Sequence, residues 1–279
     1  MSAEDRPDQV KTSDSEYERF AEIYTVWTDS AASARDNLPF YRDTYLAASG
    51  PVVELGIGDG RIAVEAAMRG RPVFGVDLSS AMLERCRERA RTAGVLDRLT
   101  LIQADFRDFA LDDPAGLIAL PYHSIGHLTT LDQKRAAICH IFSRLRPGGT
   151  FVFDDFRMTP DLMARMRTVQ LRAAYRDRSG GDRLLWVTSL VDEPTQSITV
   201  VTWEDELDAS GQLQRRRYRR LSLSWLEPAQ ARALLEAAGF TIEACFGDFQ
   251  RQPFEPLSAS EQIWIARKPL SRPGTNPLW

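Results

Sequence analysis

The stretch ELGIGDG, residues 54–60, decides the fold. It begins inside an apolar run, residues 51–56, and is followed at 61–69 by a segment with helical spacing. Glycine at every second position lets the backbone turn sharply and approach a ligand closely, because glycine has no Cβ. The stretch therefore predicts a strand, a ligand-binding turn and a helix, in that order.

Strand-like and helix-like segments alternate downstream of this turn. The apolar runs are near-continuous and the segments between them are amphipathic, which is typical of an α/β protein with a parallel sheet covered on both faces. Ser79 is a suitable N-cap for the helix after the second strand. Strands are expected at 51–56, 71–78, 99–105, 116–122, 150–156, 240–249 and 261–268, and helices at 61–69, 81–94, 131–145 and 227–238.

Two regions depart from this alternation. Residues 17–46 have helical spacing, and Pro39 is expected to separate two helices there. A helix is expected from Pro160 to about Arg172, and three strand-like runs follow at 184–191, 197–207 and 214–226. Successive strands without helices between them pair antiparallel. We therefore expect an N-terminal helical segment (1–46), an α/β domain (47–158 and 227–268), an inserted helix with an antiparallel sheet (159–226) and a loose tail (269–279).

Composition and charge exclude several classes of protein. The chain has 279 residues, 43% of them hydrophobic, and a formal net charge of −4. These values are typical of a globular protein in water, and the slightly acidic balance argues against a nucleic-acid partner. The sequence shows neither an apolar run long enough for a membrane span nor a signal peptide. Three widely spaced cysteines, Cys86, Cys139 and Cys245, favour the reducing cytoplasm.

Polar residues follow the first strands at the point where each is expected to end. Asp77 ends the second strand, where a carboxylate is suited to bind both hydroxyls of a ribose. Asp105 and Phe106 follow the third strand and suit an adenine, one as an acceptor and the other as an aromatic face. Ligands of open parallel sheets bind at the carboxyl ends of the strands, so these residues predict one nucleoside site. A NAD(P)-dependent oxidoreductase is the alternative, because GxGxxG also opens such a unit, although the spacing here is GxGxG.

Residues 50–156 resemble the class I S-adenosylmethionine-dependent methyltransferases. The resemblance is carried by ELGIGDG (54–60), GVDLS (75–79), QADFRDF (103–109), LPYHSIGHL (120–128) and LRPGG (145–149). It implies a Rossmann-like seven-stranded sheet with the last strand antiparallel, S-adenosylmethionine as methyl donor and S-adenosylhomocysteine as product. The donor-binding residues that it implies are Tyr24, Glu54, Gly56, Gly58, Gly60, Asp77, Leu78, Asp105, Phe106, Leu120 and Pro121.

A narrower resemblance concerns residues 121–128, which are similar to the fourth-strand motif of small-molecule N-methyltransferases, amino-sugar enzymes among them. Those enzymes also have an N-terminal helical lid and an antiparallel insertion. The resemblance implies methylation of an N or O atom of a small molecule in secondary-metabolite (antibiotic or sugar) biosynthesis, with Tyr17, Trp27 and Tyr122 at the acceptor. The insertion is expected to cap the acceptor or to form a homodimer or higher homo-oligomer. A non-catalytic protein that binds S-adenosylmethionine remains an alternative.

The catalytic candidates are His127 and His123, four residues apart after the fourth strand. A histidine near its usual pKa can act as a base toward an acceptor, whereas the plainer interpretation is a loop residue bonded to the backbone. His140, inside a helical segment, is expected to be structural. No metal is expected, because the fourth strand ends in apolar residues where metal-dependent relatives need a carboxylate. The acidic pair Asp154-Asp155 at the end of the fifth strand is only a weak metal signal.

Overall fold

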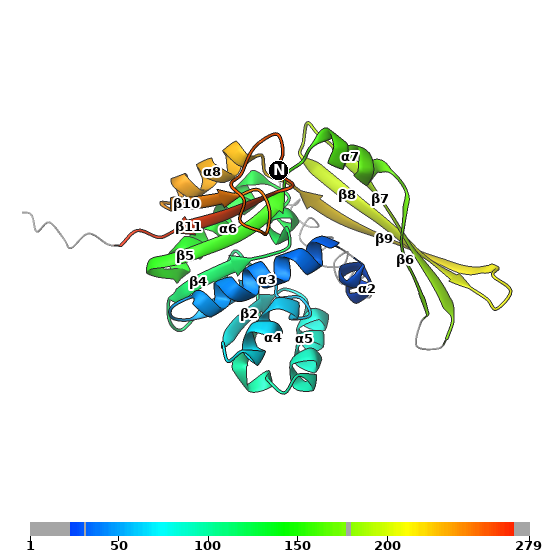
Figure 1. The fold of residues 1–279 in the computed structure, drawn as a ribbon, viewed down its shortest axis with the longest axis horizontal. Coiled ribbons are helices and arrows are strands. Elements are labelled where there is room, and N and C mark those ends of the chain that lie inside the picture. The colour runs from blue at the N-terminus through cyan, green and yellow to red at the C-terminus, as the bar shows by residue number, and fades with distance from the viewer. Residues whose placement is uncertain (1–22, 31, 177–179, 271–279) are drawn as a thin grey trace, which may run out of the picture. The chain divides into compact units, whose positions relative to one another are not determined.

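The computed structural model describes residues 23–30, 32–176 and 180–270 (Figure 1). These residues form two compact units. The larger unit consists of residues 35–157 and 226–270, and the smaller one of residues 23–34 and 158–225. No described helix combines the length and apolar character that a membrane span requires.

The larger unit is built on a seven-stranded sheet with the strand order β10-β11-β5-β4-β1-β2-β3. Strands β1 to β5 pair in parallel, whereas β11 runs antiparallel to both of its neighbours, β5 and β10. This confirms the expected sheet with one antiparallel strand. The strands are β1 (Val52–Leu55), β2 (Val73–Asp77), β3 (Leu99–Gln103), β4 (Ala115–Leu120), β5 (Leu145–Phe156), β10 (Thr241–Phe246) and β11 (Glu261–Arg267).

Helices cover both faces of this sheet. One apolar cluster joins the strands to α6 (Leu131–Arg144) and α8 (Pro228–Ala237), and another joins them to α3 (Ala32–Ala47), α4 (Arg61–Met68) and α5 (Ser80–Thr92). Ser79 caps α5 as expected, since its side chain accepts a hydrogen bond from the Met82 N–H. Two short 3₁₀ helices, η1 (Leu96–Arg98) and η2 (Ser124–His127), lie in the connections.

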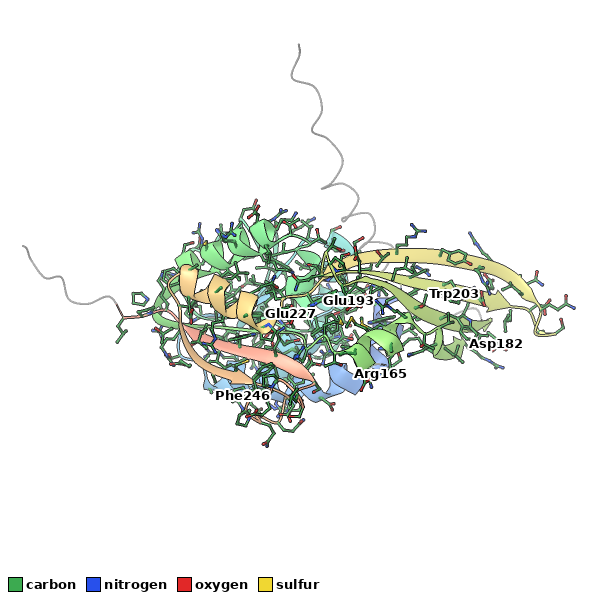
Figure 2. All side chains as sticks on the ribbon, turned by 90° about the horizontal axis from the view of Figure 1, so that it is seen from above. Arg165, Asp182, Glu193, Trp203, Glu227 and Phe246 are labelled. Atoms are coloured by element: carbon green, nitrogen blue, oxygen red, sulfur yellow. The ribbon has the colours of Figure 1, made fainter. Side chains whose placement is uncertain are left out.

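The smaller unit contains an antiparallel sheet with the strand order β6-β7-β8-β9. Its strands are β6 (Gln170–Arg176), β7 (Asp182–Asp192), β8 (Ser197–Leu207) and β9 (Leu213–Ser224), and its helices are α2 (Tyr24–Asp29) and α7 (Pro160–Arg167). Side chains project from both faces of this sheet (Figure 2). Trp186, Trp203 and Tyr218 pair across β7, β8 and β9, with neighbouring rings 6.2 Å apart. Aromatic cross-strand pairs of this kind stabilise a sheet.

Two sequence-based expectations about secondary structure are wrong. Pro39 lies inside α3 and does not end it. A proline inside a helix costs about 3 kcal/mol, but Pro39 is exposed while Phe40, Tyr41 and Tyr45 of the same helix are buried. Burial of one large apolar side chain contributes about 1.5–3 kcal/mol to stability, so the three buried side chains together outweigh that cost.

The second wrong expectation is the helix from Pro160 to Arg172. The helix α7 ends at Arg167, and residues 170–176 form β6, a fourth strand of the insertion. Most of β6 is exposed, so its sequence lacks the apolar alternation by which a strand is recognised. Its backbone is held instead by antiparallel pairing with β7.

Candidate functional site

The glycine turn after β1 requires glycine at each of its three positions. Gly56, Gly58 and Gly60 have φ values of 64°, 56° and 77°, which side chains with a Cβ rarely adopt. A Cβ on Gly60 would overlap the buried Sγ of Cys86, and one on Gly56 would lie 3.1 Å from the Ser124 hydroxyl. The turn is therefore shaped both by backbone conformation and by close packing.

Asp77 ties this turn to the end of β2. Its buried carboxylate accepts hydrogen bonds from the Gly58 N–H (2.8 Å) and the Ser79 N–H (2.9 Å). Burial raises the pKa of Asp77 to about 6, although these backbone hydrogen bonds act to lower it. A carboxylate has about four lone-pair sites, so Asp77 keeps acceptor capacity for a ligand beside the turn.

Glu54, at the end of β1, is also buried. Burial raises its pKa to about 8, against the opposing influence of the Tyr45 hydroxyl and the Arg61 guanidinium. Its Oε2 atom has no hydrogen-bond partner among the described residues. A buried oxygen of this kind would be satisfied by a cationic ligand group, and S-adenosylmethionine carries an ammonium and a sulfonium. The residues around the glycine turn thus fit that donor.

The residues after β3 differ from the sequence-based expectation in one respect. Asp105 pairs with Arg107, with the Arg107 Nη2 2.5 Å from Asp105 Oδ2 and the Arg107 Nε 2.9 Å from Oδ1. Partial burial acts to raise the pKa of Asp105, but the hydrogen bonds from Arg107 lower it overall, so this carboxylate is ionised. Phe106 is half-buried, and its ring would lie 3.2 Å from a Cβ on Gly56. Leu78, directly after β2, is exposed.

The segment after β4, residues 121–128, is termed here the histidine loop. Tyr122 and His123 have left-handed backbones, with φ values of 62° and 56°. Their two N–H groups donate to the two oxygens of Asp154, at 2.9 Å each, and the Tyr41 hydroxyl also donates to this carboxylate. At the other end of the loop, the Lys134 ammonium donates to the Ile125 carbonyl at 2.7 Å.

Leu120 and Pro121, both expected at the donor, are buried at the start of this loop. The Leu120 side chain belongs to the apolar core of the larger unit. The Pro121 carbonyl accepts a hydrogen bond from the Ser124 hydroxyl at 2.6 Å. Tyr122 is half-buried, with the Arg61 guanidinium 5.8 Å from the centre of its ring.

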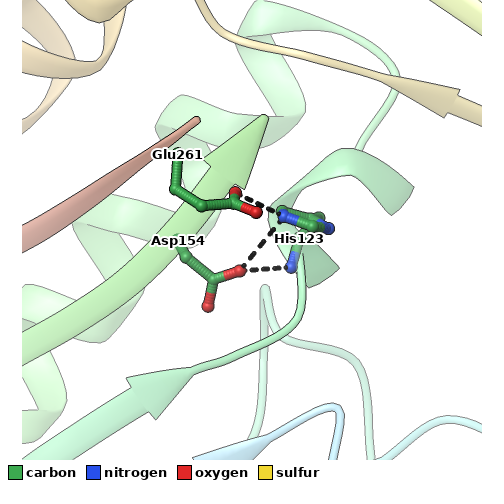
Figure 3. Close-up of side chains that lie close together, drawn as sticks. All are labelled: His123, Asp154 and Glu261. Atoms are coloured by element: carbon green, nitrogen blue, oxygen red, sulfur yellow. Dashed lines mark hydrogen bonds and ion pairs between the residues drawn. The ribbon is translucent and has the colours of Figure 1, made fainter. Parts of the chain in front are cut away.

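His123 is engaged in a buried ion pair. Its Nε2 lies 2.8 Å from Glu261 Oε2 and 3.6 Å from Asp154 Oδ2 (Figure 3), and its ring stacks on Phe156 at 3.8 Å. Burial alone would lower the pKa of His123, but Glu261, Asp154 and Asp155 raise it to about 9. At neutral pH this side chain is an imidazolium without a free lone pair.

The protonation state of His127 is the opposite of that of His123. Burial and the charge of Lys134 lower its pKa to about 4, so its imidazole is neutral at pH 7. The sequence offered both histidines as catalytic candidates, whereas the structure gives them different protonation states. The Nε2 of His140 is 2.7 Å from the Phe109 carbonyl, a contact that fits the structural role expected for it.

Sequence reasoning missed Tyr41, Lys134 and Glu261, and it considered Asp154 only as half of an acidic pair. Glu261 had one usable signal. It is the first residue of β11, and the start of an antiparallel strand lies at the same sheet edge as the ends of its parallel neighbours. His123, Asp154 and Glu261 place their ligand atoms within 4.8 Å of one another, an arrangement compatible with a metal ion.

The remaining candidates lie in the smaller unit or outside the described residues. Tyr24 and Trp27 are on α2, where the Thr28 hydroxyl donates to the Tyr24 carbonyl. The Arg172 guanidinium lies 4.5 Å from the centre of the Trp27 ring. Tyr17 falls outside the described residues. The roles of these aromatic residues at the donor and the acceptor stay predictions.

The sheet topology separates the two nucleoside-binding folds that the sequence left open. A dinucleotide-binding fold has six parallel strands in the order 3-2-1-4-5-6. Here an antiparallel strand, β11, lies between β5 and β10. The oxidoreductase alternative therefore finds no support in the fold.

Comparisons with known proteins point in the same direction. Residues 52–149 match a family described as "Methyltransferase domain". The tRNA 5-carboxymethoxyuridine methyltransferase of Escherichia coli K12 is 34% identical over 113 residues, which cover 38% of this chain and 42% of that protein. The dTDP-3-amino-3,4,6-trideoxy-alpha-D-glucopyranose N,N-dimethyltransferase of Streptomyces venezuelae is 26% identical over 192 residues, covering 64% and 78%. The chain spans less than half the length of the first of these relatives.

Solved structures share the fold over nearly the whole chain. The CcbJ methyltransferase of Streptomyces caelestis superposes with a TM-score of 0.73 at 23% identity, covering 90% of this chain and 96% of that one. The amino pentose methyltransferase CalS10 of Micromonospora echinaspora gives 0.63 at 22% identity, covering 96% and 100%. Its glycine turn, its seven-stranded sheet and its match at residues 52–149 make the chain similar to the class I S-adenosylmethionine-dependent methyltransferases.

Proposed function

We propose that the protein transfers a methyl group from S-adenosylmethionine to an N or O atom of a small molecule in secondary-metabolite biosynthesis. The observation that carries this proposal is the glycine turn, in which three left-handed glycines are tied by Gly58 to the carboxylate of Asp77. Glu54 adds a buried, unsatisfied oxygen beside a site suited to a cationic donor. S-adenosylhomocysteine is the expected product.

Each part of the donor has a suitable group in the larger unit. The glycine turn and Glu54 suit its methionine part, and Asp77 suits its ribose hydroxyls. Asp105 is ionised, and Phe106 presents a half-buried ring, as recognition of an adenine requires. Asp105 would share its oxygens between Arg107 and the adenine amine, since a carboxylate accepts more than two hydrogen bonds.

The bound donor supplies an electrophilic methyl group attached to a neutral leaving group. Little charge then needs stabilisation on the leaving side, so catalysis rests mainly on holding the acceptor in line with the methyl group. The histidine loop carries Tyr122 and His127 for this purpose. Tyr17, Trp27 and Tyr122 stay predicted acceptor contacts, and Tyr24 stays a predicted donor contact.

His127 is the residue we propose to act on the acceptor. Because its imidazole is neutral at pH 7, it can accept a hydrogen bond from an N–H or O–H of the acceptor molecule. This hydrogen bond would orient the acceptor atom so that its lone pair points at the methyl group of the donor. A base with a pKa of about 4 is too weak to remove a proton from an ammonium group, so His127 is better suited to orient an amine that is already neutral. His123, the other predicted catalytic candidate, is less suited to this role because it is paired with Glu261.

An amine of a sugar-like molecule is the acceptor class with the strongest support. The Streptomyces venezuelae relative, which acts on an amino sugar nucleotide by its name, covers more of this chain than the E. coli relative does. The sugar N-methyltransferase KedS8 shares the fold with a TM-score of 0.66. The histidine loop has the sequence on which the resemblance to amino-sugar enzymes was based.

Calorimetry followed by a transfer assay tests the proposal. S-adenosylhomocysteine should bind the protein and NAD(P) should not. With donor labelled in its methyl group and a panel of small amines and alcohols, His127→Asn should slow transfer by about 100-fold. His140→Asn is the matched control, because the His140 ring contacts Phe109 outside the histidine loop, and it should leave transfer by the folded protein nearly unchanged.

Two outcomes would contradict the proposal in different ways. Binding of NAD(P) without S-adenosylhomocysteine would remove the methyltransferase function altogether. Binding of S-adenosylhomocysteine with no single-turnover transfer to any acceptor would favour a non-catalytic binding protein that retains the fold.

A further inference from the structure

The histidine loop adopts a backbone that its own residues do not favour. Tyr122 and His123 are consecutive non-glycine residues with positive φ, a conformation that persists only where surrounding groups enforce it. The strain lies two residues after the end of β4, at the start of the segment that carries His127. Something outside the loop must therefore hold it.

Asp154 supplies that constraint. It is fully buried on β5, the strand that pairs with β4, and its two oxygens receive the Tyr122 and His123 N–H groups separately. Successive N–H groups in left-handed backbone converge on one anion in this way. The Tyr41 hydroxyl donates to the same carboxylate from α3, and the His123 ring lies beside it (Figure 3).

Lys134 holds the opposite end of the loop. Its ammonium is buried on α6 and donates to the Ile125 carbonyl, in the middle of the turn that ends at His127. Between the two anchors, Ser124 lies against Gly56, where an added Cβ would come within 3.1 Å of its hydroxyl oxygen. The loop is thus fixed by an anion at its start, by a cation at its end and by contact with the glycine turn.

We propose that Asp154 and Lys134 are positioning residues, which together set the backbone of residues 122–127 and so place His127 for methyl transfer. This inference rests on the proposed function, because it concerns how His127 reaches the acceptor. Neither residue needs to touch the donor or the acceptor. The His123–Glu261 ion pair adds a side-chain anchor to the backbone anchor that Asp154 provides.

The same atoms suggest a metal ion as a competing interpretation, since His123, Asp154 and Glu261 lie close together. Hydrogen bonding explains the arrangement without one. Both oxygens of Asp154 already accept donors from the protein, and the 2.8 Å between His123 Nε2 and Glu261 Oε2 is a normal hydrogen-bond length. The experiment below includes the metal as an outcome that would overturn the proposal.

Nuclear magnetic resonance of the whole chain tests the proposal. The sequence contains three histidines, so each imidazole signal is assigned by single substitution. In Asp154→Asn, the Tyr122 and His123 amide signals should leave their downfield positions, and the His127 imidazole signal should shift with them. Asp155→Asn is the comparison variant, because Asp155 is equally buried and its charge also acts on Lys134, but its oxygens accept from the Leu226 and Phe156 N–H groups, so the Tyr122 and His123 amide signals should stay in place.

A rescue separates shaping of the backbone from simple loss of stability. Glycine tolerates positive φ, so Tyr122→Gly added to Asp154→Asn should return the His127 signal toward its original position. In Lys134→Met, the titration of His127 should move upward from a pKa of about 4, because a nearby positive charge has been removed. With any acceptor found in the transfer assay, Asp154→Asn should lower the rate about 10- to 100-fold, mainly in kcat.

Three results would overturn the proposal. The first is an unchanged His127 signal in folded Asp154→Asn. The second is an equal shift of that signal in Asp155→Asn, which would indicate a general effect of buried charge. The third is stoichiometric metal in the purified protein that disappears in Asp154→Asn. Failure of the proposed function is recognised separately, because the wild-type protein would then not bind S-adenosylhomocysteine.

Discussion

The two sheets of this protein use buried charges in different ways. In the seven-stranded sheet, the carboxylates of Asp77, Asp154 and Asp155 stand at the ends of strands and accept hydrogen bonds from backbone N–H groups of neighbouring loops. In the four-stranded sheet, charged residues stand within strands and pair with each other across them, as Asp205 does with Arg216. Carboxylates at the strand ends hold the backbone of the neighbouring loops. Ion pairs within the strands favour one pairing register between neighbouring strands.

The difference explains where ligand chemistry is concentrated. A carboxylate that holds N–H groups keeps further lone pairs and faces the edge of the sheet where loops gather. A carboxylate paired with arginine across two strands is largely satisfied and holds the sheet together. Glu204 is an example of the second kind, because it accepts from both Tyr175 and Arg219.

The largest effect that tests this contrast is expected at the glycine turn. Gly60→Ala adds a Cβ where φ is 77° and where it would overlap the Cys86 sulfur. Left-handed strain and overpacking together should lower the free energy of unfolding by about 3 kcal/mol. Binding of S-adenosylhomocysteine should fall at least tenfold, as calorimetry would show.

Gly94→Ala provides the matched control for this substitution. Gly94 has a similar φ of 69°, but nothing lies within 4 Å of the added Cβ. Its cost should be that of the backbone alone, about 1 kcal/mol, with donor binding unchanged. Cys86→Ala should recover part of the loss in Gly60→Ala by making room. Equal destabilisation of the two glycine variants would show that packing at the turn is unimportant.

A smaller effect, dependent on pH, is expected at Glu54. Its pKa of about 8 in the folded protein lies above its unfolded value, so the unfolded chain releases its proton first. The resulting stability is complete below the unfolded pKa and is lost as the pH rises toward 8. In Glu54→Gln, the free energy of unfolding should therefore fall less between pH 5 and pH 8 than it does in the wild-type protein.

Urea denaturation at several pH values checks this expectation. Glu243→Gln is the control, because Glu243 is partly exposed and pairs with Arg267 at the surface. Asp77 and His123 also have raised pKa values, so both proteins should retain some pH dependence, and the informative quantity is the difference between them. Parallel pH profiles for wild type and Glu54→Gln would show that Glu54 is not the buried acid described here.

Much of the larger unit was predictable because its information is local. Apolar runs and glycine spacing predicted the strands of the parallel sheet and the glycine turn. Asp77 was identified from its distance to that turn. The protonation states of His123 and His127 were not predictable, since they depend on Glu261, 138 residues from His123, and on burial beside Lys134.

The smaller unit was less predictable for a related reason. Its edge strand β6 is largely exposed and has no apolar alternation, so nothing in the sequence separates it from the end of a helix. The expected helix break at Pro39 was wrong for a different reason. The cost of a proline inside α3 is outweighed by the burial of neighbouring aromatic residues. In both cases the deciding contacts come from elsewhere in the fold.

The smallest effects are expected in the smaller unit, where they distinguish an interior pair in the sheet from a surface pair beside it. Tyr175→Phe removes the hydroxyl that donates to the nearly buried Glu204, which should cost about 1 kcal/mol. Glu193→Gln breaks the exposed pair with Arg167, which water and salt already screen, so its urea midpoint should match that of the wild type. If the two variants unfold at the same midpoint with unchanged slopes, Glu204 contributes no more than a surface charge, and the contrast between the sheets would be limited to their strand ends.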